Sequence, residues 1–155
     1  MVLGFLSATA QWIARITLVS MTLIIGWQVF ARFVLNDSPS WSESSAVLLM
    51  GWFVMVGAAA GVRHRDHIGF TVGLILMPPG LRRYVRMFGK VLIALFGVAM
   101  AYFGFDLVAG TWNVIMPGSF LPQGAHYLPL VVGGVLIALF ALEKLVELGL
   151  EKEGE

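Results

Sequence analysis

The chain has 155 residues, of which 59% are hydrophobic and 12% are charged. Globular domains are about 45–50% apolar and about 25% charged, so this composition and the mean hydropathy of +0.88 exclude an ordinary water-soluble domain and favour a lipid bilayer as the solvent. A net charge of +1 does not supply the basic field that nucleic-acid binding needs, and a chain without cysteine has neither disulfides nor thiolate metal sites.

Four long apolar stretches predict an all-α integral membrane protein with four transmembrane helices. About 20 residues at about 1.5 Å each cross the roughly 30 Å hydrocarbon core, and each stretch has this length once its flanks are included. A turn-rich segment with Pro117, Gly118 and Pro122 separates the last two stretches. One membrane domain is expected over residues 1–155, with helices near residues 10–34, 41–63, 82–112 and 124–147.

The connection between the second and third helices differs from the spans. Its uncharged part, Ile68–Leu81, has 14 residues and ends in Pro78, Pro79 and Gly80, so it is too short to cross the membrane. Apolar residues at helical spacing form one stripe, and arginines stand at both ends. The pattern predicts a short amphipathic helix near residues 67–78 in the membrane interface; a short core helix between the spans is the alternative.

Basic residues predict the orientation. The connection between the second and third helices and its flanks hold six of them, whereas the first loop has Arg32 alone and the third loop has none; the six are Arg63, Arg65, Arg82, Arg83, Arg86 and Lys90. Cytoplasmic loops carry an excess of Lys and Arg. The rule predicts that this connection and both termini are cytoplasmic. No signal-peptide pattern opens the chain, so the first helix is expected to be retained.

Ionisable residues in or near membrane spans are the default candidates for function. Here they are Arg15, Arg32, Lys90, Asp106 and Glu143. In the predicted topology Arg32 lies near the outer face, where an ion pair with Asp106 or Glu43 is sterically plausible. Glu143 lies near the inner face, where an ion pair with Arg15 or Lys90 is sterically plausible. Simple anchoring of Arg15 and Lys90 in the headgroups is the alternative.

The second predicted helix opens with a capping pattern. Ser40 and Glu43 follow Pro39 at the spacing of an S-x-x-E capping box. Capping alone explains Glu43, and contact with a partner protein is the alternative. Trp41 stands where an aromatic belt is expected, whereas Trp52, in the middle of the helix, is expected to be buried or to face a partner.

Small residues predict a close helix–helix contact. Gly57 and Gly61 enclose three alanines in a GxxxG pattern, which lets another backbone approach in lipid, either in the same chain or in another chain. Gly97 with Ala101, and Gly133 with Gly134, repeat the pattern more weakly.

Signatures of catalysis and metal binding are missing from the sequence. It contains no GxSxG, P-loop or HExxH motif, so an enzyme is not expected. The run Arg63-His64-Arg65-Asp66-His67 has no standard metal-ligand spacing, and its arginines disfavour a cation. No acidic residue occupies the middle of a span, which argues against a carrier that works alone.

The run from Gln28 to Glu43 has a recognisable pattern, R-F-x-L-N-x-S-x-x-W-x-E, which begins at Arg32. Together with Trp52, Gly57 and the later Arg63 and His67, it resembles the small permease subunit of tripartite ATP-independent periplasmic (TRAP) transporters, the DctQ-like family. Ser44 departs from the family pattern, in which a second acidic residue often follows the glutamate.

The resemblance implies a function as a subunit in a bacterial inner membrane. In that family a large permease subunit holds the substrate and sodium sites, a periplasmic substrate-binding protein delivers an organic acid, and the small subunit braces the scaffold. No cofactor of this chain is implied. Matched to the family motif, Arg32, Ser40, Trp41 and Glu43 would form the outward corner near the docked binding protein. Further predicted partner or scaffold contacts are Trp27, Trp52, Gly57 and Gly61.

Two other functions remain open at this point. A small homo-oligomeric multidrug exporter needs an acid in its pathway, for which Asp106 is the candidate. A structural membrane assembly protein has the same packing features without transport.

Overall fold

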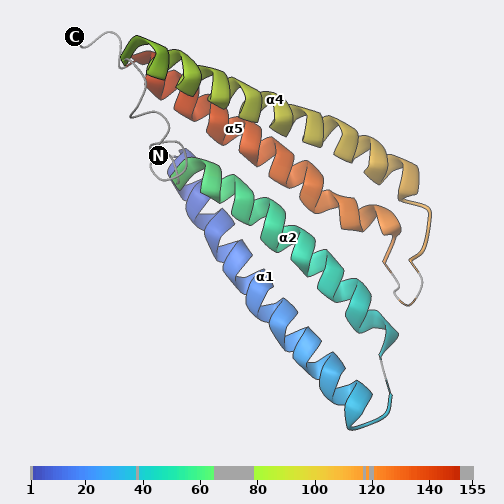
Figure 1. Ribbon diagram of the computed structural model, residues 1–155. Helices are drawn as coiled ribbons and strands as arrows, with labels where there is room; N and C mark the ends of the chain where they lie inside the picture. Colours follow the sequence, from blue (N-terminus) through green and yellow to red (C-terminus); the bar gives the residue numbers. More distant parts are fainter. Residues whose placement is uncertain (1, 38, 65–78, 117, 119–120, 151–155) are drawn as a thin grey trace.

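The computed structural model describes residues 2–37, 39–64, 79–116, 118 and 121–150 (Figure 1). Each of its four α-helices includes a stretch that is apolar and long enough to cross a bilayer. This confirms the predicted all-α fold with four membrane-length helices; the interfacial helix predicted near residues 67–78 lies outside the described residues. The helices are α1 (Val2–Phe33), α2 (Ser40–His64), α4 (Pro79–Thr111) and α5 (Leu128–Leu150), and a short 3-10 helix, η1 (Gln123–Tyr127), precedes α5.

Two helix boundaries differ from the prediction. The first helix begins at Val2 rather than near residue 10, because its first two turns pack inside the protein, where Leu3 and Leu6 lie against a core cluster that includes Phe140. The last α-helix begins at Leu128 rather than near residue 124. Proline is well tolerated in the first turn of a helix, and Pro129 occupies that turn of α5.

The four helices lie side by side in the order α1, α2, α5, α4 (Figure 1). The beginning of α1 and the end of α5 lie at the same end of this layer. As edge helices, α1 packs mainly along α2, and α4 packs mainly along α5. In the most apolar 18 residues of each span, only 6% of the residues of α1 are buried inside the protein, against 39% of those of α5. The apolar outer surfaces are therefore left for lipid or for another protein.

The closest described contact between two helix backbones joins α4 to α5. A methyl group added to Gly97 would lie 2.7 Å from the backbone nitrogen of Ala138, and one added to Gly134 would lie 2.7 Å from the backbone nitrogen of Ala101. The two backbones therefore touch through small residues four positions apart on both helices. In lipid the hydrophobic effect does not drive helices together, so membrane helices associate through van der Waals contacts, and small residues allow the close approach that these contacts need.

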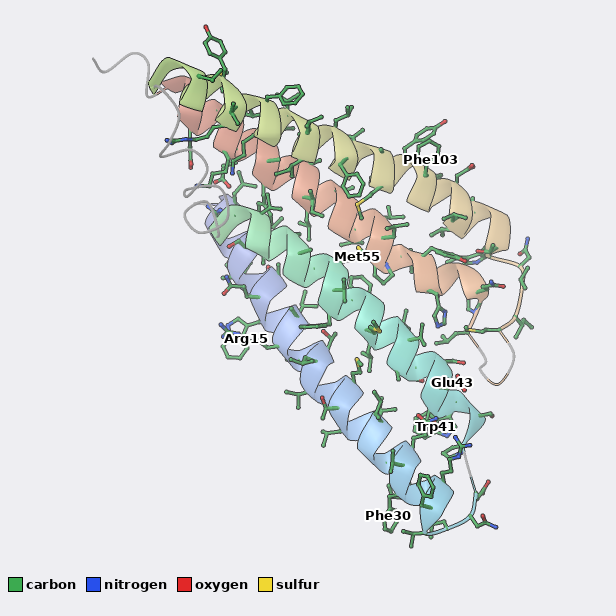
Figure 2. All side chains as sticks on the ribbon, in the orientation of Figure 1. Arg15, Phe30, Trp41, Glu43, Met55 and Phe103 are labelled. Atoms are coloured by element: carbon green, nitrogen blue, oxygen red, sulfur yellow. The ribbon has the colours of Figure 1, made fainter. Side chains whose placement is uncertain are left out.

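The contact between α2 and α5 uses one glycine against one larger side chain. A methyl group on Gly133 would lie 2.7 Å from Cβ of Met55, which Figure 2 shows on the α5 side of α2. Farther along α2, Ala59 packs in a cluster with Ile137 and Phe140. Met55 leaves no room for a side chain at position 133, so Gly133 sets how close α2 and α5 lie.

In the predicted GxxxG patch, alanines rather than the two glycines are buried against the rest of the chain. Its alanines Ala59 and Ala60 are buried within the chain. Among the described residues, a methyl group on Gly61 would meet no atom within 4 Å, and one on Gly57 would make only an ordinary 3.8 Å contact with Ala14. The closest backbone contacts therefore occur at the glycines of α4 and α5, which the sequence marked as weaker, and the partner role of Gly57 and Gly61 stays a prediction.

Candidate functional site

The loop between α1 and α2 holds a tight corner at the end of the layer opposite the N-terminus. Asn36 has a φ of 54°, in the left-handed region that asparagine tolerates better than most residues. This conformation turns the chain so that the N–H of Asp37 donates to the carbonyl of Ala31, with N and O 3.2 Å apart. The asparagine of the motif therefore has a conformational role.

An open groove of about 460 Å³ lies at this corner; it is lined by Trp27, Ala31, Leu35, Asp37, Pro39 and Trp41. The indole side chains of Trp27 and Trp41 are each about half exposed, at 49% and 48%. The corner thus presents two aromatic rings and one carboxylate to its surroundings. We refer to these six residues together with Arg32 and Glu43 as the outer corner.

The charged motif residues are not paired with each other. Arg32 at the end of α1 and Glu43 at the start of α2 are both exposed, and the described residues contain no ion pair of either side chain. Asp106 is exposed on α4, which lies at the opposite edge of the layer from α1 (Figure 1). The predicted pairing of Arg32 with Asp106 or Glu43 is therefore wrong, because the helix order separates the first pair and the second pair does not touch.

The capping box predicted at the start of α2 does not form among the described residues. Ser40 is itself the first residue of the helix, so it does not occupy the capping position before it. The hydroxyl that makes a bond here is that of buried Ser42, which donates to the carbonyl of Pro39 over 2.6 Å. Glu43 is thus left exposed, as Figure 2 shows beside Trp41.

The second outer loop is tied to the same corner. Nε2 of His126 in η1 lies 3.0 Å from the carbonyl oxygen of Ser44, and since a carbonyl only accepts, Nε2 carries the hydrogen. Gly118 has a φ of 79°, and a methyl group on it would lie 3.0 Å from Cβ of Ser40. The second outer loop therefore packs against the start of α2, next to the outer corner.

At the other end of the layer, one ion pair joins three helices. Nε of Arg63 on α2 lies 2.9 Å from Oε2 of Glu143 on α5, which is an ion-pair contact without the alignment of a hydrogen bond. Nη2 of the same guanidinium donates a hydrogen bond to Oε1 of Glu143 over 3.0 Å. The same guanidinium donates to the carbonyl of Leu3 on α1 and lies 5.8 Å from the ring centroid of Phe140. The two side chains are only 20% and 16% exposed.

This pair corrects the predicted partners of Glu143, which were Arg15 and Lys90. The sequence did not indicate Arg63 as a partner of Glu143. This pairing follows from the helix order, because α5 packs against α2 and the C-terminal end of α2 therefore lies beside the C-terminal end of α5. Lys90 is half-buried on α4, and Arg15 lies over the ring of Trp12, 5.5 Å from its centroid.

Trp52 packs inside the chain. It lies against a cluster of Ala10, Val56 and Ala60, between α1 and α2. This agrees with the burial expected in the middle of the helix. Over the part of the chain that the structure describes, no three His, Cys, Asp or Glu residues are grouped as a metal site would require.

Comparisons with known proteins agree with this architecture. A family model described as the DctQ component of tripartite ATP-independent periplasmic transporters matches residues 21–149. The C4-dicarboxylate TRAP transporter small permease protein DctQ of Vibrio cholerae is 31% identical over 124 residues, which are 79% of this chain and 49% of that protein. This chain thus spans about half the length of that relative.

Two further relatives carry related names. The sialic acid TRAP transporter small permease protein SiaQ of Vibrio cholerae is 25% identical over 131 residues, 83% of this chain and 75% of that protein. The sialic acid TRAP transporter permease protein SiaT of Haemophilus influenzae is 24% identical over 100 residues, 64% of this chain and 16% of that protein. Since the family model covers most of a chain with four membrane-length helices, this multi-pass membrane protein belongs to the DctQ component family of TRAP transporters.

Proposed function

We propose that this chain is the small membrane subunit of a sodium-coupled, binding-protein-dependent transporter that imports an organic acid across the bacterial inner membrane, with both termini in the cytoplasm. Its partners are a large permease subunit and a periplasmic substrate-binding protein. The observation that carries the proposal is the family match over residues 21–149. A partner of permease type is supported by SiaT, because a segment similar to this chain makes up 16% of that longer permease protein.

The packing favours a bracing role for this subunit. Contact between backbones at Gly97 and Gly134 and the ion pair of Arg63 with Glu143 hold the helices in one arrangement. The described acidic residues of the spans, Glu43, Asp106, Glu143 and Glu147, lie toward the helix ends. A rigid layer without a central carboxylate suits a brace better than a conduit, and the substrate and sodium sites are assigned to the large subunit.

The exporter alternative receives no support from the position of Asp106. A proton-coupled exporter needs an acid that faces the pathway. Asp106 instead lies within the last two turns of α4 (Pro79–Thr111), away from the middle of the span. Uptake assays also distinguish an assembly protein from a transporter subunit. Once the large subunit has been inserted in the membrane, only a transporter subunit is still required for uptake.

The test is reconstitution of the large permease into liposomes, with and without this chain, in the presence of the binding protein. Labelled succinate and sialic acid are suitable probes, since relatives are named for C4-dicarboxylates and sialic acid. We expect uptake driven by an inward sodium gradient with the chain and background uptake without it. Equal uptake in both preparations would refute the proposal.

The outer corner is proposed to help dock the binding protein. Arg32→Ala and Glu43→Ala are each expected to lower uptake roughly two- to ten-fold while the chain keeps its thermal stability, because both charges are exposed and form no described ion pair. The matched control is Asp106→Asn, at the outer end of the opposite edge helix, which should keep full uptake. Full uptake in both Arg32→Ala and Glu43→Ala would remove the motif charges from docking.

A further inference from the structure

The second outer loop, residues 112–127 between α4 and α5, carries no charged residue. The 36 residues between Asp106 and Glu143 include no Asp, Glu, Lys or Arg. The first outer loop is different, since Arg32, Asp37 and Glu43 stand in it or at its edges. Apolar surface that a loop leaves exposed marks contact with a membrane or with another protein.

Large apolar side chains dominate the exposed surface in the described part of this loop. The exposed fractions are 48% for Trp112, 48% for Val114, 73% for Ile115 and 40% for Leu121. Ile115 forms an antiparallel bridge with Pro122, so the chain is extended here, and neighbouring residues of an extended chain point to opposite sides. Val114 and Ile115 thus present apolar surface on both sides of the segment, which suits immersion in an apolar medium.

Hydrogen bonds within the loop pair part of its backbone. The N–H of Met116 donates to the carbonyl of Leu121, with N and O 3.3 Å apart, and the N–H of Gln123 donates to the carbonyl of Val114 over 2.8 Å. The N–H of Val114 donates to the carbonyl of Thr111 over 3.2 Å. Backbone groups close to hydrocarbon need partners within the protein, because little water is available there. This pairing lowers the cost of placing the loop against lipid.

The loop lies at the level where the hydrocarbon core ends. The charge-free run of α2, Ser44–Val62, has 19 residues, or roughly 28 Å of helix, which is close to the thickness of the core. Nε2 of His126 lies 3.0 Å from the carbonyl oxygen of Ser44, at one end of this run. A methyl group on Gly118 would lie 3.0 Å from Cβ of Ser40, one helical turn farther out. Since the headgroups extend about 5–7 Å beyond the core, these contacts place the loop in the headgroup layer.

We propose that the second outer loop inserts Trp112, Val114 and Ile115 into the adjacent lipid leaflet, at the boundary between headgroups and acyl chains, and so fixes the depth of α4 and α5 in the bilayer. This boundary accepts aromatic and apolar side chains. A charged protein surface would find no complementary charge on this loop, whereas Arg32 and Glu43 at the outer corner offer both signs. The lipid contact does not depend on the function proposed above, because the chain alone in a bilayer is sufficient to test it.

Fluorescence quenching tests the insertion. The chain has no cysteine, so one introduced cysteine carries a nitrobenzoxadiazole label at a single place. Ile115→Cys is compared with Asp37→Cys, in the first outer loop, in nanodiscs whose phospholipids carry a nitroxide near the top of the acyl chain. We expect about three-fold stronger nitroxide quenching at position 115 than at position 37, and the reverse order for iodide in the water, because interfacial side chains lie about 5–10 Å deep. Iodide quenching at position 115 as strong as at position 37 would overturn the insertion.

A charge introduced into the loop tests whether apolar side chains drive the insertion. Val114→Asp, combined with the label at Ile115→Cys, is expected to lower nitroxide quenching about two-fold, because a carboxylate is unfavourable near hydrocarbon. Val34→Asp is the matched control, since it places the same charge at a 64% exposed site of the first outer loop and should leave the quenching unchanged. Size-exclusion chromatography in detergent checks that both variants are folded. Unchanged quenching in folded Val114→Asp would contradict an insertion driven by these side chains.

The large permease subunit provides the last comparison. Nitroxide quenching of the label at Ile115→Cys should persist when the permease is added to the nanodiscs. Loss of this quenching on addition of the permease would show that the permease covers the loop, and the lipid contact would then be wrong while the subunit function stands. If the permease does not bind the chain at all, the subunit function is refuted, and the quenching of the chain alone still decides the lipid contact.

Discussion

Replacement of Gly97 or Gly134 by valine is expected to separate α4 from α5 and to lower the folded yield of the isolated protein. Each new Cβ would lie 2.7 or 2.8 Å from backbone atoms of the facing helix, namely the nitrogen of Ala138 or Ala101 and the carbonyl oxygen of the facing glycine. A backbone cannot rotate away as a side chain can, so the helices must move apart. Overpacking costs about 1–3 kcal/mol where side chains adjust, and we expect at least the upper end here.

Thermal denaturation in detergent, followed by size-exclusion chromatography, measures this effect. The matched control is Gly89→Val, on the same helix as Gly97, which should leave the Tm unchanged because a methyl group there would meet no described atom within 4 Å. Gly61→Val is the informative comparison, because the GxxxG pattern predicts a close contact there, whereas no described atom lies within 4 Å of a methyl group added at Gly61. A loss of Tm at Gly61 as large as at Gly97 would contradict the observed packing.

Removal of Arg63 is expected to loosen the inner end of the layer. Arg63→Leu leaves the largely buried carboxylate of Glu143 without its cation and the carbonyl of Leu3 without its donor. Loss of one member of a buried pair costs about 3–5 kcal/mol, and at 20% and 16% exposure we expect about 3 kcal/mol of unfolding free energy. Denaturant unfolding of the detergent-solubilised protein measures the change.

Two further variants separate a charge effect from a packing effect. The double variant Arg63→Leu with Glu143→Leu should recover most of the lost stability, because no unpaired charge remains. Glu147→Gln breaks the ion pair with Lys144, in which Glu147 is 56% exposed, and should cost about 1 kcal/mol or less. Equal losses in Arg63→Leu, the double variant and Glu147→Gln would contradict a buried ion pair that joins three helices.

The candidate site was partly predictable from local pattern. The sequence pattern predicted a loop between a helix that ends near residue 34 and one that begins near residue 41, and in the structure Asn36 takes the left-handed backbone in that loop. It also placed Trp41 and Glu43 in the first turn of α2. It was wrong about the hydrogen bond in that turn, since Ser42 rather than Ser40 makes it, and the difference depends on the residue at which the helix begins.

The sequence alone determined the number of spans and the fold class, because both follow from local properties. A stretch of about 20 apolar residues must form a helix in lipid, where each backbone N–H and C=O needs a partner within the segment. These rules depend on neighbouring residues only, so four long apolar stretches were sufficient to predict four membrane-length helices.

Which residues meet depends on how the helices pack in three dimensions. The apolar faces of all four helices are similar in composition, so pattern could not show that α5 rather than α4 lies beside α2. That order brings Arg63 to Glu143 and separates Arg32 from Asp106. It also makes Gly97 and Gly134 the closest contact and leaves Gly61 open. Contacts between helices distant in sequence depend on their mutual packing in three dimensions, which no local pattern encodes.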